Sequence, residues 1–122
     1  MESVKNQFDL EFEGGFCDRD EQEARDAGYR GGVTVSLGPG RRYSVTFYDP
    51  VRLAQDLATE KSAGAACIAE PGMIVVPEVT KENMRMAVEQ LVGEGFFETL
   101  KPTALHMSKS FSANLTSSIA NV

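Results

Sequence analysis

Hydrophobic and polar residues alternate over three short stretches in the first half of the chain. An alternation with a period of two is typical of β-strands that are buried on one face only. The first stretch, residues 7–13, separates its apolar from its acidic residues: Phe8, Leu10 and Phe12 against Asp9, Glu11 and Glu13. This pattern predicts a strand with one side in the core and one acidic side in water.

The second and third alternating stretches, residues 32–37 and 42–48, have matched patterns and are separated by residues 38–41. Two such runs joined by a short glycine-containing segment predict a β-hairpin. We expect six residues to share its buried face: Val33, Val35, Leu37, Tyr43, Val45 and Phe47.

The connection in this hairpin reads SLGPGRRY, and its closely spaced glycines followed by two arginines also suit a phosphate-binding loop. However, the glycine spacing matches neither common phosphate-binding fingerprint, and the next element is a strand rather than a helix. Pro39 also removes one backbone donor. We therefore predict a turn. Arg41 and Arg42 leave it on opposite faces, so at most one of them can reach the acidic stripe.

The period changes to that of a helix at Asp49, which is a good N-cap and is followed by Pro50 at the first helical position. The residues of its apolar stripe are Val51, Ala54, Leu57, Ala58 and Lys61. Thr80 is expected to cap a second amphipathic helix, with a stripe of Met84, Ala87, Val88, Leu91 and Val92. Glycines at 64 and 93 mark the predicted ends of the two helices.

Between these helices, residues 65–69 and 73–79 flank a predicted turn at residues 70–72 and are interpreted as strands. Residues 73–76 are all apolar without alternation, which predicts a strand buried on both faces. Cys67 lies in the first of these stretches and is expected to be a small packing residue, as is Cys17.

Residues 18–28 are almost wholly polar, and two interpretations remain open: a solvated helix ending at Gly28, or an irregular excursion. The start of this segment suggests a calcium-binding loop. That interpretation fails because Glu23 replaces the required glycine and Tyr29 replaces the required final glutamate.

Together these elements predict an α+β fold, with a mostly antiparallel sheet and two amphipathic helices packed on one face, in the order β-β-β-α-β-β-α. Residues 1–101 are expected to form a single domain. Residues 102–122 form a polar C-terminal tail that is weakly helical or docked, with apolar residues every fourth position at Phe111, Leu115 and Ile119.

The chain of 122 residues carries a net charge of −6, with a pI of about 4.8, and this acidity disfavours nucleic-acid binding. No apolar run approaches the ~20 residues that span a bilayer, and the N-terminus lacks a signal-peptide pattern. We therefore expect a cytoplasmic protein that does not enter membranes.

Few residues suit catalysis. His106 is the only histidine and lies in the tail, while Cys17 and Cys67 have no metal-binding spacing. Neither cysteine has the positive surroundings that make a thiol reactive. We expect no catalytic residues, no metal and no cofactor. Whether the protein is an enzyme stays open, and the sequence favours a non-enzyme.

Seven residues are the candidate binding residues: Asp9, Glu11, Glu13, Arg41, Arg42, Tyr43 and Tyr48. The acidic stripe has two interpretations, a recognition surface for a basic partner or a solvated face paired with Arg41, Arg42 or Lys5. The leading functional hypothesis is protein–protein interaction or self-association. One form of it is an acidic protein that neutralises a basic one, of the kind that bacteria pair with a basic toxin or nuclease.

Two alternatives are kept. The first is a small-molecule-binding domain or enzyme with a pocket between sheet and helices, where Arg52 joins the arginines and tyrosines above as a polar contact. The second is a structural subunit of a homo-oligomer, held by Phe96, Phe97 and the tail.

Overall fold

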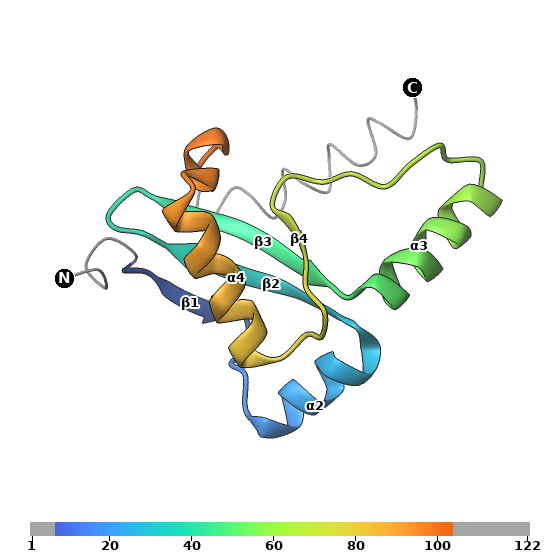
Figure 1. Cartoon of the computed structure of the whole chain (residues 1–122), viewed down its shortest axis with the longest axis horizontal. Coiled ribbons are helices and arrows are strands. Elements are labelled where there is room, and N and C mark those ends of the chain that lie inside the picture. Colours follow the sequence, from blue (N-terminus) through green and yellow to red (C-terminus); the bar gives the residue numbers. More distant parts are fainter. Residues whose placement is uncertain (1–6, 104–122) are drawn as a thin grey trace.

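The computed structural model describes residues 7–103 as one α+β unit with a four-stranded mixed sheet (Figure 1). Along the chain the elements are β1 (Asp9–Phe12), α2 (Asp18–Ala27), β2 (Tyr29–Ser36), β3 (Arg42–Tyr48), α3 (Pro50–Ser62), β4 (Met73–Val75), α4 (Lys81–Gly93) and the 3₁₀ helix η1 (Phe96–Thr99). The predicted fold class is thus confirmed. The predicted order is wrong in two places, because a helix follows β1 and only one strand follows α3.

The strands lie in the order β1-β2-β3-β4. β1 pairs with β2 and β2 with β3 in antiparallel fashion, whereas β4 pairs parallel to β3. The parallel pair arises because α3 and the loop after it carry the chain back past the end of β3, so that β4 runs in the same direction as β3. The sheet is therefore mixed.

The predicted hairpin is confirmed. Its turn is closed by two backbone bonds, from the Leu37 amide to the Arg41 carbonyl at 2.9 Å and from the Arg41 amide to the Gly38 carbonyl at 3.0 Å. β2 begins earlier than predicted, at Tyr29, because a bulge between Arg30 and Val33 hides the alternation there. Gly32 has a φ of +67° at this bulge.

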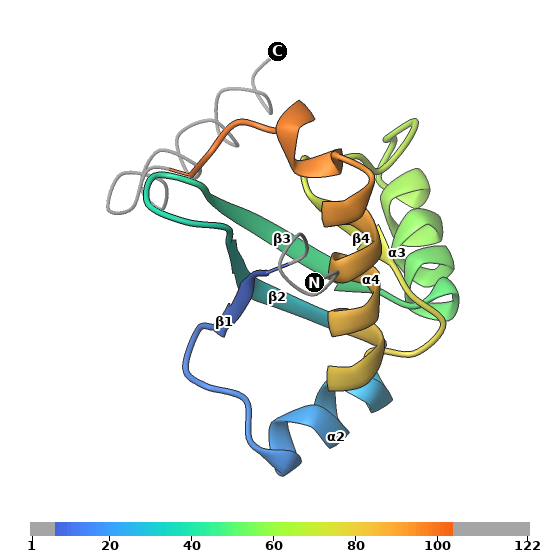
Figure 2. The same ribbon diagram turned by 60° about the vertical axis from the view of Figure 1, so that its left-hand side comes forward.

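One face of the sheet packs against α4, and the core lies between them (Figures 1 and 2). Five of the six hairpin residues predicted to share a face are buried there, and Leu37 is half-buried against the same core. The remaining core residues come from the other elements: Ala24, Ile74, Val76, Val79, Met84, Val88 and Phe97.

The polar segment after β1 is a helix, so the interpretation as an irregular excursion is wrong. The Asp20 carboxylate accepts a hydrogen bond from the Cys17 amide at 3.1 Å, and Gly28 ends the helix with a φ of +70°. Ala24 is the buried residue of α2. Backbone capping at both ends therefore stabilises a helix with very little apolar surface.

Three predictions for the segment between the long helices are wrong. Residues 65–69 form no strand, and Cys67 is exposed, as is Cys17. Ile74 and Val76 are buried, but Val75 between them is 48% exposed, so β4 is not buried on both faces. The reason is that β4 is an edge strand and α4 covers only one face of the sheet.

α3 is the largest departure from expectation. Its start follows the sequence rules, since the Asp49 carboxylate accepts a hydrogen bond from the Arg52 amide at 2.7 Å. Yet none of its residues is buried, and the helix stands apart from the sheet (Figure 1). The prediction that two helices pack on one face is therefore wrong for α3.

After η1 the chain returns to the sheet. The Thr103 amide donates to the Arg42 carbonyl at 2.7 Å, and the Thr103 hydroxyl accepts from the Ser44 amide at 3.1 Å. These bonds continue the edge that β4 occupies farther along β3. His106 and the predicted apolar positions of the tail lie outside the described residues.

Candidate functional site

The acidic stripe is only partly a free surface. Asp9 and Glu11 are both exposed, and the Glu11 carboxylate accepts two hydrogen bonds from Arg42, at 2.6 and 3.0 Å. The hydrogen bond from Arg42 lowers the pKa of Glu11, and the same contact raises the pKa of Arg42. Of the two turn arginines, Arg42 therefore pairs with the stripe, while Arg41 lines a small pocket beside Glu98.

Tyr43 does not lie at a binding surface. Its side chain is buried in the core, and its ring centre lies 5.4 Å from that of Phe97. Its place among the candidate binding residues thus reflects its residue type and not its position.

Tyr48 lies where β3 leads into α3, and its hydroxyl donates to the Glu70 carboxylate at 3.3 Å. Its ring contacts Tyr29 edge-on at 5.2 Å. Burial, together with the negative charge of Glu70, raises the pKa of Tyr48 to about 12. Near neutral pH this residue is therefore a neutral hydrogen-bond donor that fixes the base of α3.

Arg52 completes this junction. Its Nε donates to the Asp56 carboxylate at 2.9 Å, and a terminal nitrogen donates to the carbonyl of Ala27 at 3.1 Å. The guanidinium lies 5.0 Å from the centre of the Tyr29 ring, close enough for a cation–π contact. The positive charge of Arg52 is thus used inside the protein, where it attaches α3 to the end of α2.

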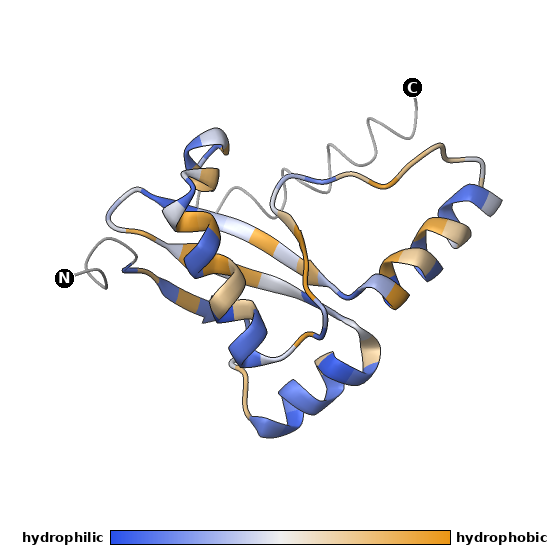
Figure 3. Cartoon of the chain, in the orientation of Figure 1, coloured by the Kyte–Doolittle hydropathy of each residue, from blue (hydrophilic) through white to orange (hydrophobic). Residues whose placement is uncertain are grey.

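Exposed apolar side chains lie on α3 and on the strands at its base. Of the large hydrophobic residues within 7–103, five are exposed: Tyr29, Val51, Leu57, Val75 and Met86. Val51 and Leu57 are 65% and 44% exposed on α3 itself, a helix along which hydrophobic and hydrophilic positions are mixed (Figure 3). Tyr29 and Val75 are the strand neighbours of Tyr48, two residues before α3 begins. Only Met86 belongs to another helix.

We define the α3 surface as Tyr29, Val51, Ala54, Leu57, Ala58 and Val75. On the helix, its members recur at spacings of three and four residues, which places them on one side. Exposed apolar residues that are concentrated in one part of a small protein suggest a contact site. The α3 surface is therefore the candidate functional site.

The sequence missed this surface in two ways. Tyr29 stood outside every predicted strand, because the glycine bulge breaks the alternation, and Val75 was assigned to a doubly buried strand. The stripe of α3 was recognised, but its direction was not. One signal was present: Ala54 and Ala58 offer little apolar surface to a core, and Lys61 carries a charge.

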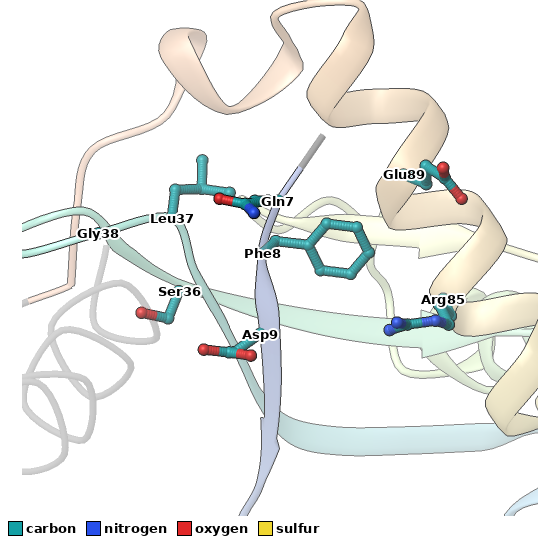
Figure 4. A pocket seen from close by; sticks show the side chains of 8 residues that line it. All are labelled: Gln7, Phe8, Asp9, Ser36, Leu37, Gly38, Arg85 and Glu89. Carbon is teal, nitrogen blue, oxygen red and sulfur yellow. The ribbon is translucent and has the colours of Figure 1, made fainter. Parts of the chain in front are cut away.

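A surface pocket of about 540 Å³ lies away from α3, between β1, the β2–β3 turn and α4 (Figure 4). Arg85 reaches across it, with its guanidinium 5.5 Å from the centre of the Phe8 ring, while Glu89 lies one turn farther along α4 (Figure 4). Arg85 and Glu89 come from the same helix, Asp9 of β1 adds a third charged side chain, and the apolar lining is limited to Phe8 and Leu37.

A second pocket of about 470 Å³ lies between α2 and the bulge of β2, lined by Glu13 and by Arg30. Arg30 is structural in part, because it donates to the carbonyl of Glu13 at 2.9 Å and packs 4.9 Å from the ring centre of Phe16. Within residues 7–103, no cluster of His, Cys, Asp and Glu side chains is arranged to hold a metal ion.

Comparison of the chain with protein-family models, curated proteins and solved structures finds no match. None of the helices in residues 7–103 has both the length and the apolar character needed to cross a membrane. A functional proposal therefore has to rest on the residues and contacts described above.

Proposed function

We propose that this acidic protein acts by binding another protein rather than by catalysis, and that the α3 surface makes the contact. The observation that carries the proposal is the position of the exposed apolar residues: four of the five large ones lie on α3 or beside its base. A helix of 13 residues with no buried side chain contributes little to the stability of its own domain. Binding a partner gives its apolar stripe a role.

The polar residues first considered for binding support this view through the contacts they make. Arg42 is engaged by Glu11, Arg52 by Asp56, and Tyr48 by Glu70. Each of these pairs holds the scaffold together, so the exposed hydrophobic residues on α3 and at its base are the stronger candidates for contact with a partner. With a net charge of −6, a basic partner suits the field of the protein, as in a neutralising or immunity-type pair.

The proposal is tested by affinity capture from the native host with three versions of the full chain. The bait is wild type, the double variant Val51→Ser with Leu57→Ser, or the control Met86→Ser. Met86 is the fifth exposed hydrophobic residue and lies on α4, so its replacement removes similar apolar area outside the α3 surface.

We expect one protein to be retained by wild type and by Met86→Ser but lost with the double variant. Its affinity, measured after identification, should fall at least tenfold with the double variant, because two central apolar contacts are removed. Equal retention by all three baits contradicts the proposal.

Small-molecule binding is a second candidate, favoured by the pocket beside Phe8 and Arg85 (Figure 4). No hydrogen bond or ion pair within the described residues engages Arg85, so its guanidinium is available to an anionic group. A screen of small carboxylates by thermal shift, repeated with Arg85→Gln, tests this idea. A stabilising compound whose effect survives the substitution does not bind through this pocket.

A further inference from the structure

The pocket beside Phe8 contains two opposite charges that are not paired with each other. Arg85 and Glu89 are four residues apart on α4, which places them on one side of the helix and one turn apart. Ion pairs form at this spacing, but the order with the basic residue first is the less favourable one. The Arg85 guanidinium lies over the Phe8 ring instead, and no hydrogen bond or ion pair within residues 7–103 engages either charged side chain.

An apolar wall lies beside these two charges. Phe8 and Leu37 are half-buried, and the part of each that stays accessible lines the pocket (Figure 4). Both side chains also pack against the core, so the sheet and α4 hold them in place. The pocket therefore offers a fixed apolar surface to a ligand.

The remaining lining is polar. Asp9 is charged, but it lies on the other side of the extended chain from Phe8, because adjacent residues point to opposite sides (Figure 4). Gln7 and Ser36 add uncharged hydrogen-bonding groups. The side of the pocket toward α4 thus presents one positive charge, one negative charge and the apolar wall.

This combination discriminates between small ligands by their charge. A purely anionic ligand is attracted by Arg85 and repelled by Glu89, and a purely cationic ligand meets the reverse. A ligand that carries both charges a few ångströms apart is attracted by both side chains. The pocket volume of about 540 Å³ falls within the ~300–1,000 Å³ of typical small-molecule sites.

From these features we infer that the pocket binds a zwitterionic α-amino acid with an apolar side chain. Arg85 holds its carboxylate, for which the planar guanidinium is suited, and Glu89 holds its ammonium group. The apolar side chain packs against Phe8 and Leu37. This inference rests on the second candidate function, small-molecule binding, and specifies the class of ligand.

The exposure of the two charges sets the expected affinity. Arg85 and Glu89 are both exposed, so water and salt screen their attraction for a ligand. For a ligand of about 12 non-hydrogen atoms, we therefore expect a dissociation constant on the order of a millimolar. Amide NMR titration of the full chain measures binding in this range and identifies the residues near the ligand.

The probe is phenylalanine, compared with three analogues that each lack one feature. Phenylpropionate has no ammonium group, phenethylamine has no carboxylate, and glycine has no apolar side chain. Phenylalanine should bind at least about fivefold more tightly than each of them. It should also shift the amide signals of Phe8, Leu37 and Arg85.

Two neutralising variants assign the two charges. Arg85→Gln should weaken phenylalanine binding about three- to tenfold, and Glu89→Gln about two- to fivefold. Phenethylamine should bind Arg85→Gln at least as tightly as wild type, and phenylpropionate should do the same with Glu89→Gln, because each substitution removes a repulsion. Glu82→Gln is the matched control, since Glu82 lies in the first turn of α4 and does not line the pocket. It should leave every affinity unchanged.

The possible failures are distinguishable. If phenylpropionate binds as tightly as phenylalanine and Glu89→Gln weakens neither, the ligand is a simple anion: the inference is wrong and the small-molecule candidate stands. If phenylalanine binding is unchanged in both neutralising variants, it takes place outside this pocket and the inference is wrong. If none of the compounds shifts the amides around the pocket at ~20 mM, the inference and anion binding by Arg85 both fail.

Discussion

α3 and α4 are the same length, 13 residues, and begin in the same way. In each, an N-cap side chain accepts a hydrogen bond from a backbone amide, Asp49 from Arg52 and Thr80 from Asn83. Each also carries an apolar stripe. Nevertheless α4 buries Met84 and Val88 against the sheet, whereas α3 buries no side chain at all.

The difference shows that an apolar stripe predicts a helix more reliably than it predicts where that helix packs. The sheet has one covered face, and the larger side chains of α4 fill it together with Phe97. A stripe that includes Ala54, Ala58 and Lys61 gains less from burial, so α3 is left on the outside. Substitutions in the two helices should therefore have very different consequences for stability.

The largest effect is expected in α4. Met84→Ala removes a fully buried side chain and should lower the free energy of unfolding by about 2–5 kcal/mol, because it leaves a cavity under the sheet. Urea denaturation followed by circular dichroism measures the change. A loss below about 1 kcal/mol contradicts the assignment of α4 as the core helix.

The next effect concerns the connection that brings the chain from α3 back to the sheet. Gly72 has a φ of +79°, and a Cβ at this position would collide with the carbonyl oxygen of Ser44 on β3. Gly72→Ala should therefore cost about 1–3 kcal/mol, through backbone strain and loss of β3–β4 pairing. Gly64→Ala is the matched control, since its φ is also positive but nothing lies within 4 Å of its Cβ.

The junction of β3 and α3 should respond to alkaline pH. The folded-state pKa of Tyr48 is raised to about 12 from 10.0, so its contribution to stability is complete below pH 10 and is lost as pH rises through 12. We expect a loss on the order of 1–2 kcal/mol over this range. In thermal melts, the stability difference between wild type and Tyr48→Phe should be constant below pH 10 and should shrink as the pH rises from 10 to 12; a difference that stays constant over the whole range contradicts this prediction.

Removing the caps separates local from global stability. Thr80→Ala and Asp49→Ala each delete one N-cap hydrogen bond, worth about 1 kcal/mol. Because α4 is part of the core, Thr80→Ala should lower global stability by that amount. Asp49→Ala should instead speed amide exchange within α3 and leave the urea midpoint nearly unchanged. Equal shifts of the midpoint show that α3 unfolds together with the core.

The smallest effect is expected for Leu57→Ala. Since this side chain is 44% exposed and contacts no buried core, the free energy of unfolding should change by less than about 0.5 kcal/mol. The same chemical denaturation detects it. A loss comparable to that of Met84→Ala means that α3 is packed against other residues in solution.

Several features of this protein follow from the sequence alone, and all of them depend on neighbours along the chain. The alternation of the hairpin strands, the turn at Gly38–Arg41 and the helix starts at Asp49 and Thr80 are local patterns with local physical causes. The same is true of Gly28, which ends α2 by adopting a positive φ. The α+β class follows because an antiparallel hairpin combined with amphipathic helices is compatible with few other fold classes.

Only the tertiary structure decided which side chains are buried, which are paired and which stay exposed. The pairing of Arg42 with Glu11 depends on strand register, and the burial of Tyr43 depends on which face α4 covers. The exposure of Val75 and of the α3 stripe follows from competition for a single covered face of the sheet, whereas the parallel placement of β4 follows from the path of the chain between β3 and β4. Which segment covers the sheet depends on the apolar volume and the geometry of segments that are distant in the sequence. A local pattern along the chain carries no information about those other segments.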